Sequence, residues 1–225
     1  NKVLLIRQII NENEQAGGDS TQVLRLFDRM LDTPKPSADI AELRAAYMDL
    51  KKMPADSINT ALRRVLEIAP DNAGARLHLI QSVWPTEDYD AVIALCRPAL
   101  EYNPDEMAFY YYLGVAHYQK DEDDEALDAF RRGVSQINSE SNHAIVSDFY
   151  SIMGDILHKK GRDQEAFAAY DSCLQWNPDN VPCLNNYAYY LSVRGENLQK
   201  AEQMSYRTIK AQPDSGTYLD TYAWI

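Results

Sequence analysis

Apolar side chains recur at spacings of three and four residues along most of this chain. Such positions fall on one side of an α-helix, so the pattern predicts helices with one buried face. In the segment from Met107, the stripe of apolar, aromatic and small residues consists of Tyr110, Leu113, Gly114, His117, Ala126, Phe130 and Gly133. Each such segment holds two amphipathic helices. Gly161 and Gly195 fall where two helices join, and glycine readily adopts the left-handed conformation that a tight turn uses there.

Pro-Asp pairs mark a repeat along the chain. Pro70 and Pro104 are 34 residues apart, and Pro178 and Pro213 are 35 residues apart. The 74 residues from Pro104 to Pro178 equal two periods of 34 plus six extra residues. A period of this length that holds two helices predicts an array in which neighbouring units bury one another's apolar faces.

This pattern resembles the tetratricopeptide repeat family, whose units are 34 residues long. In residues 147–180, for example, Gly154, Ala166, Tyr170 and Pro178 stand on signature positions of the family. The resemblance implies an all-α fold, a right-handed superhelical solenoid of antiparallel helix pairs that forms one domain. Its expected parts are a divergent helix pair at 1–38, a weakly matching repeat at 39–72, repeats at 73–106, 107–140, 147–180 and 181–215, an insertion at 141–146, and the first helix of a truncated repeat at 216–225.

Two local segments carry separate expectations. The insertion is expected to lengthen the helix that follows it, with Ser141 or Asn142 as the N-terminal cap. The acidic run KDEDDE, from Lys120 to Glu125, lies where a second helix begins. Acids there are stabilised by the free amides and the dipole of the helix, and the run lacks the alternating ligands and central glycine of a calcium loop.

Charge narrows the range of partners. The chain has 22 basic and 34 acidic side chains, a net charge of −12, which argues against nucleic acid and against anionic membrane surfaces. No apolar run is long enough to span a membrane, and the first residues lack the features of a signal peptide. The sequence leaves both the cytoplasm and an exported location in the bacterial cell envelope open.

No motif for catalysis, metal binding or cofactor binding is present. The four histidines have no metal-ligand spacing, and Cys96, Cys173 and Cys183 match no zinc pattern. His117 stands on a core signature position and is expected to be structural, and the three cysteines are expected to be free, buried thiols. We therefore expect a protein that is not an enzyme and that uses no metal or cofactor.

The resemblance places the candidate binding surface on a concave groove, because the first helices of the repeats line such a groove in this family. Carried over residue by residue, the candidate binding residues are His78, Gln81, Tyr111, Tyr112, Tyr118, Asp155, Asn185, Asn186 and Tyr189. Rigid aromatic rings offer contact area and amides can bond an extended backbone, so this set favours a protein or peptide ligand. The alternative for each ring is packing between adjacent helices. Positions that would clamp a free acidic C-terminus carry no positive charge, at Leu77, Gln81, Tyr111 and Val115, so tight binding of such a terminus is not expected.

The leading hypothesis is a non-enzymatic scaffold that binds a protein or peptide segment in this groove. The alternative is a regulatory or assembly module of a longer enzyme or envelope protein, which the truncated last repeat motivates. Tyr222 and Trp224 lie in that incomplete repeat, so we expect the native chain to continue or a partner to cover them. The uncapped ends also leave self-association open.

Overall fold

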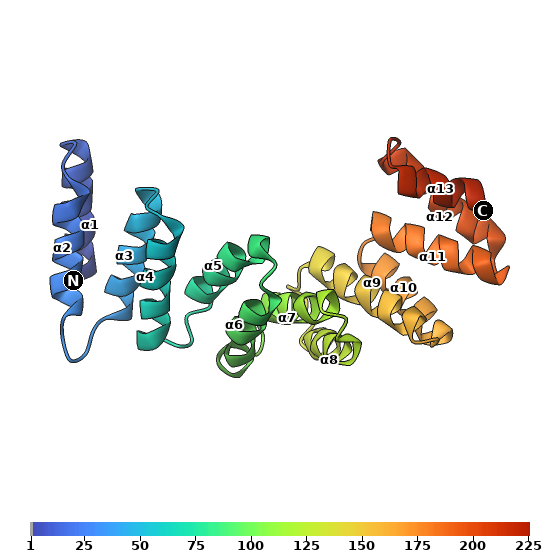
Figure 1. The fold of residues 1–225 in the computed structure, drawn as a ribbon, viewed down its shortest axis with the longest axis horizontal. Helices are drawn as coiled ribbons and strands as arrows, with labels where there is room; N and C mark the ends of the chain where they lie inside the picture. The colour runs from blue at the N-terminus through green and yellow to red at the C-terminus, as the bar shows by residue number, and fades with distance from the viewer. Residues whose placement is uncertain (1) are drawn as a thin grey trace. The chain divides into compact units, whose positions relative to one another are not determined.

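The computed structural model describes residues 2–225, with side chains described from residue 3 onward, and the secondary structure of these residues is entirely helical (Figure 1). The helices are α1 (Lys2–Gln15), α2 (Ser20–Leu31), α3 (Ala38–Leu50), α4 (Ala55–Ile68), α5 (Ala73–Val83), α6 (Tyr89–Tyr102), α7 (Met107–Gln119), α8 (Asp123–Val134), α9 (His143–Lys159), α10 (Asp163–Trp176), α11 (Val181–Arg194), α12 (Leu198–Ala211) and α13 (Gly216–Trp224). A short 3-10 helix, η1 (Trp84–Thr86), follows α5 directly. The predicted all-α class is confirmed.

The chain divides into two compact units, residues 1–112 and 113–225, with the boundary inside α7. In the first unit, α3 packs against α4, α4 against α5, and α5 against α6. In the second unit, α9 packs against α10, α11 against α12, and α12 against α13. Each helix therefore packs mainly against its neighbours in the sequence, as expected of helical repeats.

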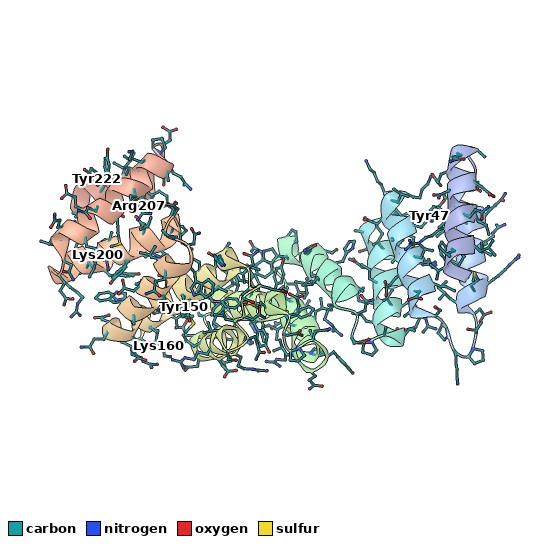
Figure 2. All side chains as sticks on the ribbon, turned by 180° about the vertical axis from the view of Figure 1, so that it is seen from behind. Tyr47, Tyr150, Lys160, Lys200, Arg207 and Tyr222 are labelled. Atoms are coloured by element: carbon teal, nitrogen blue, oxygen red, sulfur yellow. The ribbon has the colours of Figure 1, made fainter. Side chains whose placement is uncertain are left out.

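Tyr47 joins the first helix pair to α3 (Figure 2). Its ring is buried 6.2 Å from the ring of Phe27 on α2. Its hydroxyl donates a hydrogen bond of 2.9 Å to Oε1 of Glu14 on α1, and Nζ of Lys51 lies 2.8 Å from Oε2 of the same carboxylate. The end of α1 is therefore held to α3 by both packing and polar contacts.

The turns between paired helices use the left-handed backbone conformation. Gly161 has φ 72° between α9 and α10, and Gly195 has φ 65° between α11 and α12, so both predicted turn glycines are confirmed. The turn between α7 and α8 reaches the same conformation at Asp121, with φ 58°. Asp tolerates this region better than most residues with a side chain.

Two glycines allow an aromatic ring of the next helix to lie against the helix backbone. A Cβ built on Gly114 of α7 would lie 2.5 Å from Cε1 of Phe130 on α8. A Cβ built on Gly154 of α9 would lie 2.4 Å from Cε1 of Tyr170 on α10. At Gly114 the group that occupies the space a side chain would take is therefore the ring of Phe130.

The insertion lengthens α9, as predicted. This helix has 17 residues, whereas α7 has 13 and α11 has 14. Oδ1 of Asn142 caps α9 by accepting hydrogen bonds from the backbone N–H groups of Ala144 and Ile145. Ser141 instead accepts a hydrogen bond from the backbone N–H of Asn138, so Asn142 is the cap of the two candidates.

The residues expected to be structural lie where the sequence placed them. His117 is buried, and its Nδ1 is 2.6 Å from Oε2 of Glu122. Asp123, Asp124 and Glu125 occupy the first turn of α8, where the helix dipole favours acids. All three cysteines are free and buried, as predicted.

Candidate functional site

The candidate binding residues fall in both compact units, and each unit has its own set. The first unit contains His78, Gln81, Tyr111 and Tyr112, and the second contains Tyr118, Asp155, Asn185, Asn186 and Tyr189.

In the first unit, an aromatic cluster surrounds Trp84 of η1. The Trp84 ring is 5.9 Å from the Tyr89 ring and 5.2 Å from the Tyr112 ring, both in edge-to-face geometry. The Tyr111 ring stands edge-to-face on Tyr112 at 5.8 Å. Tyr111 and Tyr112 are half-buried. Tyr112 therefore packs on a neighbouring element, which was the alternative considered for every candidate ring.

The other two candidates of this unit differ in exposure. Gln81 is exposed, whereas His78 is half-buried and lines a cavity of about 570 Å³. Residues of α1, α3 and α5 line this cavity, and its charged side chains include Arg7, Asp39, Glu42 and Asp49. Glu42 also accepts a hydrogen bond from Asn72, the residue that caps α5.

In the second unit, the carboxylate of Asp155 connects three helices. Its Oδ1 accepts a hydrogen bond of 2.6 Å from the Tyr170 hydroxyl of α10 and one of 3.0 Å from Nδ2 of Asn186 of α11. Burial raises the pKa of Asp155, and the two hydrogen bonds offset only part of that effect. The carboxylate thus lies in a partly desolvated polar site and forms no salt bridge with a described residue.

The charge of this carboxylate also acts on two tyrosines, Tyr118 and Tyr190. Burial, followed by the charge of Asp155, raises the pKa of Tyr118 and raises that of Tyr190 to about 12. The Tyr190 ring lies 5.6 Å from the ring of Tyr189 and 6.2 Å from that of Tyr170. Tyr189 is the most open of the candidates in this unit, with 41% of its surface exposed.

His158 packs against one of these tyrosines. Its ring is stacked on the Tyr190 ring at a centroid distance of 3.6 Å, and its Nδ1 is 2.8 Å from Oδ1 of Asp163. Sequence reasoning did not name Tyr190 or Tyr170 as site residues. Tyr170 stands on a core signature position, and only its hydroxyl reaches the site. Tyr190 lies four residues after Asn186, a helical spacing that could have placed it beside the candidate set.

Asn185 carries an unsatisfied polar atom. The residue is only 7% exposed, and its Nδ2 donates a hydrogen bond of 3.1 Å to Oδ1 of Asn186. Its own Oδ1 is buried and accepts no hydrogen bond from any residue that the structure describes. A buried acceptor left unpaired costs about 1–3 kcal/mol, so it needs an explanation.

A second carboxylate of α9 has a similar environment. Oδ1 of Asp148 accepts a hydrogen bond of 3.0 Å from Nδ2 of Asn180, the cap of α11, and burial raises the pKa of Asp148. Asp148 and Asp155 are seven residues apart and therefore lie on the same face of the helix. In each case an asparagine associated with α11 is the donor.

The described residues contain no group of three or more His, Cys, Asp or Glu side chains arranged to hold a metal ion. Within residues 2–225, no helix combines the length and the apolar character that crossing a membrane requires.

Parts of the sequence match models of a known protein family. Family models described as tetratricopeptide repeat match residues 81–142 and 147–180. No curated protein matches the chain in sequence.

Solved structures share the fold at low sequence identity. A structure of YrrB, which is described as a tetratricopeptide repeat protein with an unusual peptide-binding site, has a TM-score of 0.66 at 17% identity and covers 88% of this chain and 97% of its own. A structure of MamA has a TM-score of 0.62 at 19% identity and covers 75% and 94%. The Cut9–Hcn1 hetero-tetramer structure has a TM-score of 0.63 at 12% identity and covers 90% and 39%. At these identities the likeness shows the fold, an all-α helical repeat solenoid.

Proposed function

The chain is a tetratricopeptide repeat protein, and we propose that it is a non-enzymatic scaffold that binds a peptide or protein segment along the first helices of its repeats. The contact residues proposed in the second unit are Tyr118, Asp155, Asn185, Asn186 and Tyr189. Those proposed in the first unit are His78, Gln81, Tyr111 and Tyr112.

The unsatisfied Oδ1 of Asn185 is the observation that carries the proposal. A buried amide oxygen without a donor is costly, and the backbone N–H of an extended ligand would supply that donor. Nδ2 of Asn185 is already bound to Asn186, so the amide orientation is fixed within a chain of hydrogen bonds that ends at Asp155. The described part of the fold therefore supplies no donor for this acceptor.

The tyrosine rings among the candidate residues also favour a peptide or protein ligand. Tyrosine rings give a ligand a large, rigid contact area at a small entropic cost, and their hydroxyls can bond to a peptide backbone. Tyr189 is the exposed ring nearest the amide pair in the sequence, whereas Tyr112 already packs on Trp84. Tyr189 is therefore the cleanest single probe of ligand contact. That YrrB is described as having a peptide-binding site makes a peptide ligand a reasonable first choice.

The test is selection of a random peptide library on the immobilised protein, followed by binding measurements with the enriched peptides by fluorescence anisotropy. We expect Tyr189→Ala and Asn185→Ala each to weaken binding by roughly threefold to tenfold, the range expected from the loss of one hydrogen bond or ring contact. Tyr102→Ala is the matched control, because Tyr102 is a similarly exposed tyrosine on α6, the second helix of its pair. Circular dichroism spectra of all three variants should match the wild type. The proposal fails if no peptide is enriched, or if the control variant weakens binding as much as Tyr189→Ala does.

A further inference from the structure

We propose that the segment bound by the second unit is basic, with two cationic side chains that contact the carboxylates of Asp148 and Asp155. This inference rests on the proposed peptide-binding function and adds the chemistry of the ligand. It is specific to residues 113–225.

The two carboxylates form no ion pair with a described lysine or arginine, although the charge of His158 acts on Asp155 and lowers its pKa. Neither Asp148 nor Asp155 forms a salt bridge with any residue that the structure describes. Oδ2 of Asp155 accepts no hydrogen bond from the described part of the chain. A partly buried carboxylate without a counter-charge is unfavourable, so a cation from outside the fold would be bound with a net gain.

The cations closest along the chain are already paired with other acids. Lys159 lies 3.0 Å from both Asp121 and Asp123. Arg194 lies 2.6 Å from Oδ2 of Asp163, whose Oδ1 is 2.8 Å from His158. These cations stabilise the turns between helices and leave the two α9 carboxylates available to a ligand.

Two more cations of this unit are paired away from the site. Lys160 lies 2.9 Å from Asp124. Lys200 lies 2.8 Å from Asp171. Both lysines are labelled in Figure 2.

An independent observation points to a ligand at the same place. The buried and unsatisfied Oδ1 of Asn185 belongs to the side chain that donates to Asn186, and Asn186 in turn donates to Asp155. An unpaired acceptor and an unpaired negative charge thus lie at the two ends of one short chain of hydrogen bonds. A peptide would satisfy both, with a backbone N–H at Asn185 and a cationic side chain at Asp155.

The tyrosines beside Asp155 suit a cation as well. The faces of aromatic rings attract cations, by about 0.5–2 kcal/mol for each well-placed ring. The charge of Asp155 acts on Tyr118 and Tyr190, and the Tyr189 ring lies 5.6 Å from that of Tyr190. A guanidinium group would combine hydrogen bonds to the carboxylate with stacking on these rings, so we expect arginine to bind more tightly than lysine.

Helix geometry gives the spacing of the two basic residues. Seven residues of α-helix advance about 10 Å along the axis, which is the separation expected between Asp148 and Asp155. In an extended polyproline-type segment, residues i and i+3 point to the same side and lie about 9 Å apart. The ligand is therefore expected to carry basic residues separated by two others.

The experiment uses the whole chain and the same random peptide library. We expect enriched peptides to contain arginine or lysine pairs at this spacing more often than the unselected library does. For a synthetic copy of the best enriched peptide, replacement of either arginine by citrulline should lower the affinity about tenfold, because it removes a charge-assisted hydrogen bond. Asp155→Asn in the protein should lower the affinity by a similar factor. Combined with citrulline at the arginine that contacts Asp155, it should cause no further loss of affinity. Asp148→Asn should do the same for the other arginine.

The matched control is Asp128→Asn, which removes one exposed carboxylate of α8 in the same unit and changes the net charge equally. Its affinity should stay within about twofold of the wild type, because exposed charges are screened by salt. Enriched peptides that are neutral or acidic would overturn this inference and leave the proposed function standing. A library that yields no binder at all would overturn both. Equal losses of affinity in Asp128→Asn and Asp155→Asn would also refute the inference, because the effect would then come from the net charge of the protein and not from a specific contact.

Discussion

The ring of Tyr170 lies directly against the backbone of Gly154, so closely that a Cβ at Gly154 would be 2.4 Å from Cε1 of the ring. Tyr170 is fully buried and its hydroxyl is bonded to Asp155, the next residue after that glycine. The ring therefore cannot move away without breaking that hydrogen bond. A single pair of residues thus couples the packing of α9 on α10 to the polar site.

Gly154→Ala is accordingly expected to destabilise the protein. Overpacking of a filled core costs about 1–3 kcal/mol, which outweighs the gain of at most about 1 kcal/mol in helix propensity. Urea unfolding measures the difference. Gly74→Ala is the control, because a Cβ there meets nothing closer than Oδ1 of Asn72 at 3.6 Å, and this variant should be as stable as the wild type or slightly more so. Equal stability of the two variants would contradict the close contact.

Much of the fold could be predicted from the sequence, because its signals are local. The repeat length and the buried face of each helix depend on the spacing of side chains along the chain. The turns at Gly161 and Gly195 depend on a residue that tolerates a left-handed backbone. The stripe of residues from Met107 also placed Gly114 on the buried face of its helix. It did not show that the ring of Phe130 lies against this glycine, because that contact depends on how two helices pack.

The site was less predictable, since it depends on side-chain conformations. The register put Asp155, Asn185 and Asn186 on the first helices of successive repeats. It did not show that the Tyr170 hydroxyl would reach Asp155, nor that one oxygen of Asn185 would be left without a donor. These features depend on distances of a few tenths of an ångström across three helices, and spacing along the chain carries no such information.

The cap of α9 gives a second stability prediction. Asn142 bonds two of the free N–H groups at the start of this helix, so Asn142→Ala should cost about 1 kcal/mol of unfolding free energy. Asn142→Ser should retain most of that stability, since serine also caps helices. Thermal or urea unfolding distinguishes the two. If both variants were equally destabilised, side-chain capping would not be the cause.

The contact between Tyr47 and Glu14 predicts a local effect on α1. Tyr47→Phe keeps the buried ring beside Phe27 and removes only the hydroxyl, which donates a hydrogen bond to Glu14 of α1. We expect amide hydrogen exchange in α1 to become about two- to tenfold faster, while exchange in α9 and α10 stays unchanged. Tyr102→Phe serves as the control, because that tyrosine is exposed on α6. Unchanged exchange in α1 would mean that the packing of the ring and the contact between Lys51 and Glu14 hold the helix without the hydroxyl.

The pH dependence of stability tests the environment of Asp155. Burial raises the pKa of this carboxyl in the folded state, so the folded protein binds its proton more tightly than the unfolded chain does. Its contribution to stability is therefore largest below the unfolded pKa of about 3.9 and is lost as the pH rises through the raised folded pKa. Asp155→Asn keeps an oxygen that can accept the Tyr170 and Asn186 hydrogen bonds but has no ionisation.

The stability of Asp155→Asn relative to the wild type should consequently increase as the pH rises through that window and then stay level. Urea unfolding of both proteins at a series of pH values gives this difference, in which the shifts of other groups cancel. Glu14→Gln provides a control of opposite sign, because the hydrogen bonds from Lys51 and Tyr47 lower the pKa of Glu14. The wild type should be more stable than Glu14→Gln above the unfolded glutamate pKa, and this advantage should be lost as the pH falls through the lowered folded value. If Asp155→Asn followed the same sign as Glu14→Gln, the Asp155 carboxylate would already be stabilised as an anion within the fold, and the unfavourable buried charge on which the ligand chemistry depends would not exist.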